Sequence, residues 1–118
     1  MCGIVTILHL HNHSSPVDRS TIERMRDRLH HRGPDDAGLW EGKQGSIGHR
    51  RLAVIDTSPA GHQPMVGLDE YGNERYILAY NGELYNDHEL RSQLATLGYK
   101  FRSNCDSETL LKALMAWG

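Results

Sequence analysis

The chain has 118 residues, a length that suits a single domain with one modest core. Its 13 basic and 15 acidic side chains give a formal net charge of −2, which excludes the broadly basic surface expected of a nucleic-acid-binding or membrane-surface protein. The first apolar run is short and interrupted by Thr6 and His9, and no later segment approaches the length that a bilayer demands, so we expect a cytoplasmic chain with reduced cysteines.

The first four residues, Met1-Cys2-Gly3-Ile4, place a cysteine directly after the initiator methionine. Methionine removal is favoured when the next side chain is small, and Cys2 would then carry both a thiol and a free α-amine. An α-amine can accept the proton of a thiol near neutral pH. One residue would thus supply nucleophile and general base, although a small residue near a terminus is the simpler interpretation of this tetrapeptide alone.

A first strand is expected at residues 4–8 (IVTIL), whose apolar run is typical of a strand covered on both faces. His9, His11 and His13 follow at spacing two and would share one face of a continuing strand, within reach of a metal. No cysteine or carboxylate lies beside them to complete a tetrahedral site. A polar strand end that runs into a loop is therefore the preferred interpretation.

The next element is a helix capped by Asp18 or Ser20. Its buried face would carry Ile22, Met25 and Leu29. We expect it to end near residues 30–36 (HHRGPDD), because the glycine there suits a helix stop and the proline prevents continuation.

Two short strands are expected at residues 38–40 and 46–47, the second continuing through Arg50 and Arg51 into residues 52–56. A guanidinium at a strand end can bind a carboxylate through two parallel hydrogen bonds. A solvated arginine pair is the alternative.

Residues 57–65 are expected to form an ordered loop, and residues 69–73 a hairpin turn. A strand at residues 75–80, again apolar on both faces, leads into Asn81 and Gly82. An Asn-Gly pair is often only a turn. A side-chain amide and a neighbouring backbone N–H aimed at one point would instead form an oxyanion hole.

Asn86 is expected to cap the following helix, with Glu89 completing a capping box and Gly98 ending the helix. The buried stripe of this helix would be Leu90, Leu94 and Leu97.

A short strand at residues 99–102 should precede a last helix, opened by Asp106 or Ser107. This helix would pack inward Leu110, Leu111, Leu114 and Met115. Asp106 could serve as a helix cap or hold a ligand ammonium. The order of elements, with its hairpin connections, predicts antiparallel sheets layered between helices.

Together these stretches resemble the class II, N-terminal-nucleophile glutamine amidotransferases, most closely the glutaminase domain of glutamine-hydrolysing asparagine synthetase. The matching segments, in the family's order, are residues 1–4 (MCGI), 31–36 (HRGPDD), 48–56 (GHRRLAVID), 62–65 (HQPM), 80–86 (YNGELYN) and 106–108 (DSE). The resemblance implies an α+β fold, the four-layer α/β/β/α sandwich of N-terminal-nucleophile hydrolases with antiparallel sheets, which we expect to be incomplete in this chain.

The resemblance also implies hydrolysis of glutamine to glutamate and ammonia through a thioester. The catalytic residues would be Cys2, Asn81 and Gly82, the last two holding the oxyanion. The substrate-binding residues would be Arg51 for the α-carboxylate, Glu83 and Asp106 for the α-ammonium, and the backbone around Leu52 and Val54. The domain itself would need no metal or cofactor.

Residues 1–118 would then be the N-terminal part of a glutamine amidotransferase type 2 domain, marginally stable or oligomeric by itself. A following synthetase domain would use ATP and magnesium to amidate aspartate or another carboxylate with the ammonia, and a homodimer is a further expected assembly. If Met1 is retained, Cys2 has no free amine, and the alternative is a non-catalytic regulatory or glutamine-binding module. A small metal-binding protein based on the three histidines is a third hypothesis.

Overall fold

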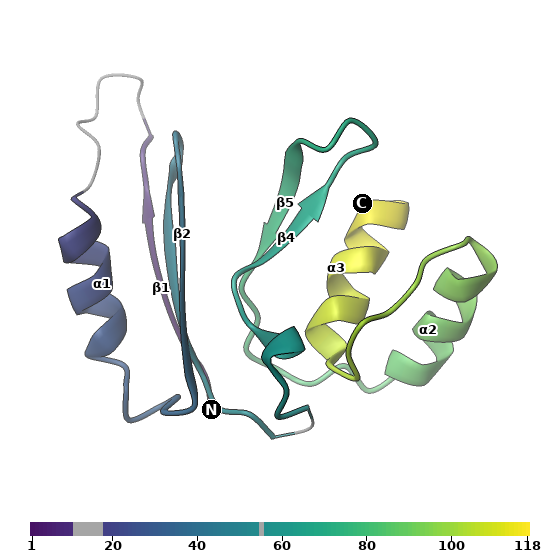
Figure 1. Ribbon diagram of the computed structural model, residues 1–118, viewed down its shortest axis with the longest axis horizontal. Coiled ribbons are helices and arrows are strands. Elements are labelled where there is room, and N and C mark those ends of the chain that lie inside the picture. Colours follow the sequence, from purple (N-terminus) through teal and green to yellow (C-terminus); the bar gives the residue numbers. More distant parts are fainter. Residues whose placement is uncertain (11–17, 55) are drawn as a thin grey trace. The chain divides into compact units, whose positions relative to one another are not determined.

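The computed structural model describes residues 1–10, 18–54 and 56–118 (Figure 1). These residues form two compact units. The N-terminal unit comprises Met1–Ala53, His62–Pro64 and Ala79–Asn81, and the C-terminal unit comprises Val54–Gly61, Met65–Leu78 and Gly82–Gly118. The buried apolar side chains include Ile22 in the first unit and Leu94 and Leu111 in the second. Within these ranges no helix is long and apolar enough to cross a membrane.

An antiparallel sheet of three strands forms the centre of the N-terminal unit. Its spatial order is β1 (Gly3–Leu8), β3 (Gly45–Arg51) and β2 (Asp36–Gly42). β1 pairs with β3 from Gly3 opposite Arg50 to Leu8 opposite Gly45. The start of β1 therefore lies beside the end of β3, which brings Cys2 next to the point where the chain leaves Arg51.

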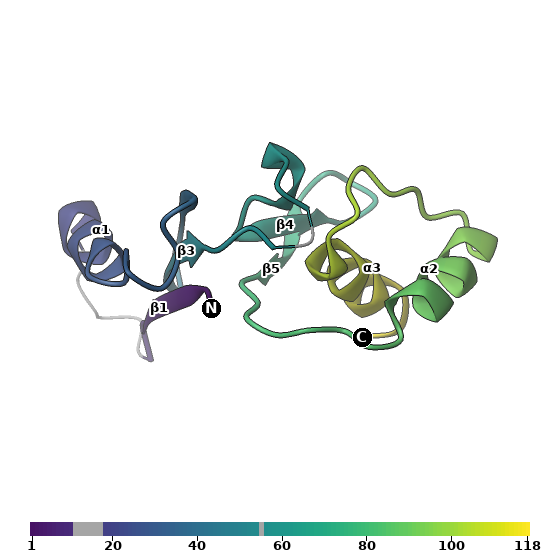
Figure 2. The same cartoon turned by 90° about the horizontal axis from the view of Figure 1, so that it is seen from below.

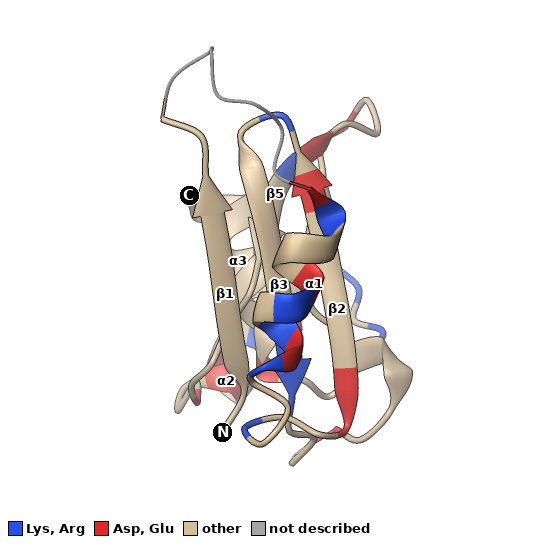
Figure 3. Cartoon of the chain, turned by 90° about the vertical axis from the view of Figure 1, so that its left-hand side faces the viewer, with Lys and Arg blue, Asp and Glu red and all other residues tan. Residues whose placement is uncertain are grey.

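Helix α1 (Arg19–Asp27) covers one face of this sheet and is rich in charged residues (Figure 3). It begins after Asp18 as predicted, but it ends at Asp27, before the HRGPDD stretch. Gly33 serves a different purpose from the predicted helix stop. A Cβ at Gly33 would lie 2.4 Å from the carbonyl oxygen of Arg50, so only glycine allows the turn after α1 to approach β3 this closely.

The two faces of β1 differ in burial within the N-terminal unit. Ile4 is partly exposed and Leu8 is 66% exposed, whereas Val5 lies on the side of α1. The apolar stripe predicted for the helix is also only partly buried, because Ile22 is fully buried and Met25 is not.

β3 ends at Arg51, and the continuation predicted through residue 56 is wrong. The Leu52 N–H points at the sulfur of Cys2, and the Ala53 N–H donates to Asp35 Oδ2 at 2.8 Å. Because side chains take these two donors, residues 52–54 are not available to a neighbouring strand, and residue 55 lies outside the described residues.

In the C-terminal unit, β4 (Met65–Leu68) and β5 (Glu74–Leu78) form an antiparallel hairpin. The turn predicted at residues 69–73 is confirmed, and η1 (Pro59–Gly61) is a short 3₁₀ turn before β4. α3 (Asp106–Trp117) packs on the hairpin, and α2 (Asp87–Thr96) packs against α3 (Figures 1 and 2). Both sheets are antiparallel, as predicted, and the described residues form a small α+β arrangement.

Both helices of the C-terminal unit begin where expected. α2 starts after Asn86, and Gly98, with φ of +92°, follows its end. The capping box is wrong, because among the described residues Asn86 makes no side-chain cap hydrogen bond. The apolar stripes are only partly buried: Leu97 and Leu114 are exposed, while Leu94 and Leu111 are buried.

Arg91 joins α2 to the segment before α3. Its guanidinium donates to the carbonyls of Ser103 at 2.9 Å and Cys105 at 2.8 Å, and it lies 4.3 Å from the ring centre of Phe101. Asp87 pairs with the same group at 3.2 Å. A planar guanidinium can make all these contacts together, so Arg91 fixes the path of the chain into α3.

Glu108 explains why the strand predicted at residues 99–102 is a loop. Its buried carboxylate accepts the N–H groups of Arg102 at 2.8 Å and Ser103 at 2.9 Å, and the Ser103 hydroxyl at 2.7 Å. Burial alone raises the pKa of the Glu108 carboxyl, but these donors and the nearby Lys112 outweigh burial and leave the pKa below its ordinary value. The ionised carboxylate therefore stabilises the folded unit above the unfolded pKa, and this contribution is lost as the pH falls through the folded pKa.

We expect the substitution Glu108→Gln to destabilise the protein by about 1–3 kcal/mol at neutral pH, because the new amide group faces donors that need an acceptor. Urea unfolding followed by circular dichroism measures the change. The control is Glu89→Gln on the exposed face of α2, where a change within about 0.5 kcal/mol is expected. Equal stability of the two variants would contradict the prediction.

His49, on β3, is fully buried. Burial lowers the pKa of its imidazole; the Tyr80 backbone and the Asp36 carboxylate oppose this shift, and His62 and Arg51 add to it. The folded chain thus keeps His49 neutral at pH values where the unfolded chain binds a proton. Stability should therefore fall as the pH drops below about 6.5.

We expect His49→Leu to reduce this acid sensitivity, because one such group contributes a slope of up to about 1.4 kcal/mol per pH unit. Urea midpoints measured from pH 5 to pH 8 test the prediction. His88→Leu, at an exposed position of α2, is the matched control. Its unfolding free energy should change with pH as that of the parent protein does. If the unfolding free energy of His49→Leu also changes with pH as in the parent protein, His49 is not the group that causes the acid sensitivity.

Candidate active site

Cys2 lies at the start of β1, half-buried, and its thiol is free. The Leu52 N–H donates to its sulfur at 3.4 Å, and the sulfur lies 3.8 Å from the Leu52 carbonyl oxygen. The Cys2 carbonyl accepts a hydrogen bond from Arg32 Nε at 3.2 Å. The Cys2 sulfur therefore contacts the backbone of Leu52, at the point where the chain leaves β3.

The two arginines that end β3 have different surroundings. Arg50 donates to the Gly33 carbonyl at 2.9 Å, contacts His30 Nδ1 at 2.5 Å, and lies 3.5 Å from Asp27. These contacts bind the turn after α1 to the sheet. Arg50 is therefore a structural residue.

Arg51 is buried and lies opposite Asp36 in the pairing of β2 with β3. Gly48 of β3 faces Val5 and α1, so the alternation of side chains places His49 and Arg51 on the face away from α1. The same alternation along β1 places Cys2 on that face. The nucleophile candidate and the carboxylate-binding candidate thus share one side of the sheet, where the two strand ends meet.

Asn81 closes the short segment Ala79–Asn81 of the N-terminal unit and is exposed. The residue before it, Tyr80, donates its N–H to Gln63 Oε1 at 2.6 Å. This bond ties the predicted oxyanion residue to the unit that carries Cys2.

Four of the predicted site residues, Val54, Gly82, Glu83 and Asp106, belong to the C-terminal unit. Asp106 opens α3, and its Oδ2 accepts the N–H of Leu84 at 2.9 Å. This contact fixes the loop that carries Gly82 and Glu83 to the start of the helix. Val54 is exposed, and Gly82 and Glu83 are exposed as well.

Two supporting residues were missed by sequence reasoning. Asp35 accepts the Ala53 N–H and so shapes the loop after β3, and Gln63 holds Tyr80. Both lie in stretches quoted for the family resemblance, HRGPDD and HQPM, which was the one available signal. Periodicity could not reveal their roles, because each acts on a segment distant in the sequence.

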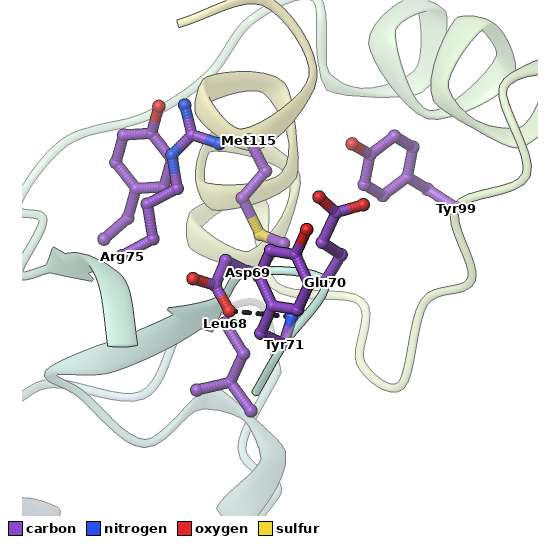
Figure 4. Close-up of a pocket in the computed structure, with 8 residues that line it drawn as sticks. Leu68, Asp69, Glu70, Tyr71, Arg75, Tyr99 and Met115 are labelled. Atoms are coloured by element: carbon purple, nitrogen blue, oxygen red, sulfur yellow. Dashed lines mark hydrogen bonds between the residues drawn. The ribbon is translucent and has the colours of Figure 1, made fainter. Parts of the chain in front are cut away.

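A hollow of about 650 Å³ lies in the C-terminal unit (Figure 4). It is lined by Leu68, Asp69, Glu70, Tyr71, Arg75, Tyr76, Tyr99 and Met115. Hydrogen bonds from Asn73 and Tyr71 lower the pKa of Asp69, whose carboxylate is thereby committed to the hairpin turn. None of the predicted site residues lines this hollow, and it offers no candidate nucleophile.

The described part of the chain contains no group of three or more histidine, cysteine, aspartate or glutamate side chains placed to hold a metal. Of the three histidines predicted to share a strand face, only His9 is described, and its N–H donates to the Gln44 carbonyl at 2.9 Å. His11 and His13 lie outside the described residues.

The second cysteine, Cys105, is also a free thiol, and its sulfur lies 2.8 Å from the Ser107 hydroxyl.

The sequence is similar to those of known proteins. A family model described as a glutamine amidotransferase domain matches residues 1–118. Glutamine-hydrolyzing asparagine synthetases 3 and 1 of Bacillus subtilis (strain 168) are each 38% identical to this chain, over 99% and 94% of its length. Glutamine-hydrolyzing asparagine synthetase 1 of Arabidopsis thaliana is 36% identical over the whole chain. The chain spans only 17–19% of the length of these relatives.

Proposed function

Because the chain belongs to the glutamine amidotransferase domain family, we propose that it hydrolyses the side-chain amide of glutamine with Cys2 as the nucleophile. The observation that carries this proposal is the place of Cys2 at the end of β3, where the Leu52 N–H lies 3.4 Å from its sulfur and Arg51 precedes Leu52. Cys2 and Arg51 thus lie at the same end of the sheet and on one face. A nucleophile and a guanidinium in these positions suit a substrate that carries both an amide and a carboxylate.

The reaction begins with removal of Met1, which is 73% exposed. The freed α-amine of Cys2 takes the thiol proton, and the sulfur forms a bond to the amide carbon of glutamine. The tetrahedral intermediate collapses with breakage of the carbon–nitrogen bond, and the nitrogen leaves as ammonia with the proton that the amine held. Water then cleaves the γ-glutamyl thioester, which releases glutamate and restores the thiol.

Negative charge on the amide oxygen is stabilised by two donors, the Asn81 side-chain amide and the Gly82 N–H. The exposure of both residues supports this role, because their donors are open to a ligand. Loss of one such donor typically costs about 3–4 kcal/mol of activation free energy.

The charges of the substrate provide its recognition. Arg51 binds the α-carboxylate, Glu83 and Asp106 bind the α-ammonium, and the backbone around Leu52 and Val54 lines the remainder. A ligand that lacks either charge would forgo the contact with Arg51 or with the two carboxylates, and this difference would favour a free amino acid.

We further infer that residues 1–118 are the N-terminal part of a glutamine amidotransferase type 2 domain with the four-layer sandwich of N-terminal-nucleophile hydrolases. The match of residues 1–118 to a glutamine amidotransferase domain supports the family part of this inference. The ammonia then serves an ATP- and magnesium-dependent synthetase domain that amidates aspartate or another carboxylate. Retention of Met1 would instead favour the non-catalytic glutamine-binding module.

An electrophilic analogue of glutamine, 6-diazo-5-oxonorleucine, tests the nucleophile. We expect intact-mass analysis of the purified protein to show loss of Met1 and one added analogue at Cys2. Cys2→Ala should abolish labelling, and the matched Cys105→Ala variant should keep it. Labelling at Cys105, or none in a processed and folded sample, would rule out the proposal.

Replacement of Arg51 by lysine tests the carboxylate site. We expect KM for glutamine to rise about 10- to 100-fold with little change in kcat, because a single ammonium cannot reproduce two parallel hydrogen bonds worth about 1.5–3 kcal/mol. Steady-state glutaminase assays measure this split. Arg50→Lys is the control, for which we expect lower stability and a KM within about twofold of the parent. A KM for Arg51→Lys no higher than that of the control would reject the role of Arg51.

A further inference from the structure

We propose that Gln63 is the positioning residue of the oxyanion site, holding Tyr80 and thereby the neighbouring Asn81 against the sheet face that carries Cys2. This inference rests on the proposed function. It adds a residue to which the resemblance assigned no role.

The first observation is the bond itself. The Tyr80 N–H donates to Gln63 Oε1 at 2.6 Å, and the Gln63 side chain is only 5% exposed. A buried side-chain acceptor that receives a main-chain donor is costly to remove, because the N–H is then left without a partner. Since Tyr80 is covalently joined to Asn81, the bond restricts where the Asn81 amide can lie.

The second observation is that Gln63 is itself firmly anchored to β2. A Cβ built on Gly38 would lie 1.7 Å from the Gln63 carbonyl oxygen, so the backbone at Gln63 rests directly on the strand. One residue earlier, His62 Nδ1 lies 2.6 Å from Asp36 Oδ2. Two positions of β2 thus fix the residues on which the bond to Tyr80 depends.

The third observation is the side of the sheet on which this anchor lies. Asp36 and Gly38 are opposite Arg51 and His49 in the pairing of β2 with β3. Residues directly opposite each other share a face, so the anchor occupies the face away from α1. Cys2 and Arg51 share this face. Gln63 therefore connects the oxyanion residue to the same rigid surface as the nucleophile.

The consequence is specific to the chemical step. Misplacement of a donor by about 1 Å can lower a rate by about 100-fold, because the donor must meet the oxygen of the intermediate rather than that of the substrate. Binding of the zwitterion by Arg51 and the reactivity of Cys2 depend on β1 and β3 and should persist. Loss of the Gln63 acceptor should thus lower kcat and spare KM.

The test compares Gln63→Met, which keeps the shape and removes the acceptor, with Gln63→Glu, which keeps an acceptor oxygen. In a Cys105→Ala background, glutaminase kcat and KM and the rate of Cys2 alkylation by iodoacetamide are measured. We expect Gln63→Met to lower kcat about 10- to 100-fold, with KM within about threefold and alkylation within about twofold of the parent. Gln63→Glu should recover most of the lost kcat. Gln93→Met, on the exposed face of α2, is the matched control and should keep the parent values.

A Gln63→Met variant with the parent kcat would overturn the inference. A folded Gln63→Glu variant whose kcat is as low as that of Gln63→Met would also overturn it. A parallel loss of Cys2 alkylation would also overturn it, because Gln63 would then support the whole unit rather than the oxyanion site. If Gln63→Met does not fold, Gln63→Asn, whose oxygen falls short of Tyr80, takes its place with the same criteria. If the parent protein does not hydrolyse glutamine, the proposed function is wrong, and this inference, which rests on it, is wrong as well.

Discussion

The pairing of β1 with β3 is the constraint on which the N-terminal unit depends. Gly3 lies opposite Arg50, so Cys2 adjoins the chain where β3 ends at Arg51 and Leu52. Successive side chains of a strand point to opposite faces, and a register shift of one residue would therefore turn Arg50, not Arg51, toward the face of Cys2. The register of one strand pair thus decides which arginine shares the face of Cys2.

The turn after α1 holds both strand ends in place. Arg32 binds the Cys2 carbonyl, Asp35 binds the Ala53 N–H, and the Gly33 carbonyl accepts from Arg50. Each of these contacts reaches a backbone group or a residue next to the site, and none needs a substrate. The HRGPDD stretch therefore fixes the ends of β1 and β3 through hydrogen bonds. For this reason, residues without a chemical role can belong to a functional motif.

Sequence reasoning located the elements better than their ends. The starts of α1, α2 and α3 and the turn at residues 69–73 were predicted from local residue preferences, although among the described residues none of these helices has a side-chain cap hydrogen bond. The end of β3 and the loop at residues 99–102 were not, because Asp35 and Glu108 remove backbone donors from possible strands. In the site, a recognisable motif pointed to Cys2 and Arg51, whereas a loop glutamine such as Gln63 belongs to no periodic pattern.

The close approaches at Gly33 and Gly38 bear on how tolerance to mutation should be interpreted in this unit. Any side chain would overlap the Arg50 carbonyl at one position and the Gln63 carbonyl at the other. Both glycines would thus reject nearly every replacement in a saturation library, although neither can exchange a proton, bind a charge or form a covalent bond. Intolerance to substitution at a position would therefore indicate close packing beside the site as readily as a direct role in the site.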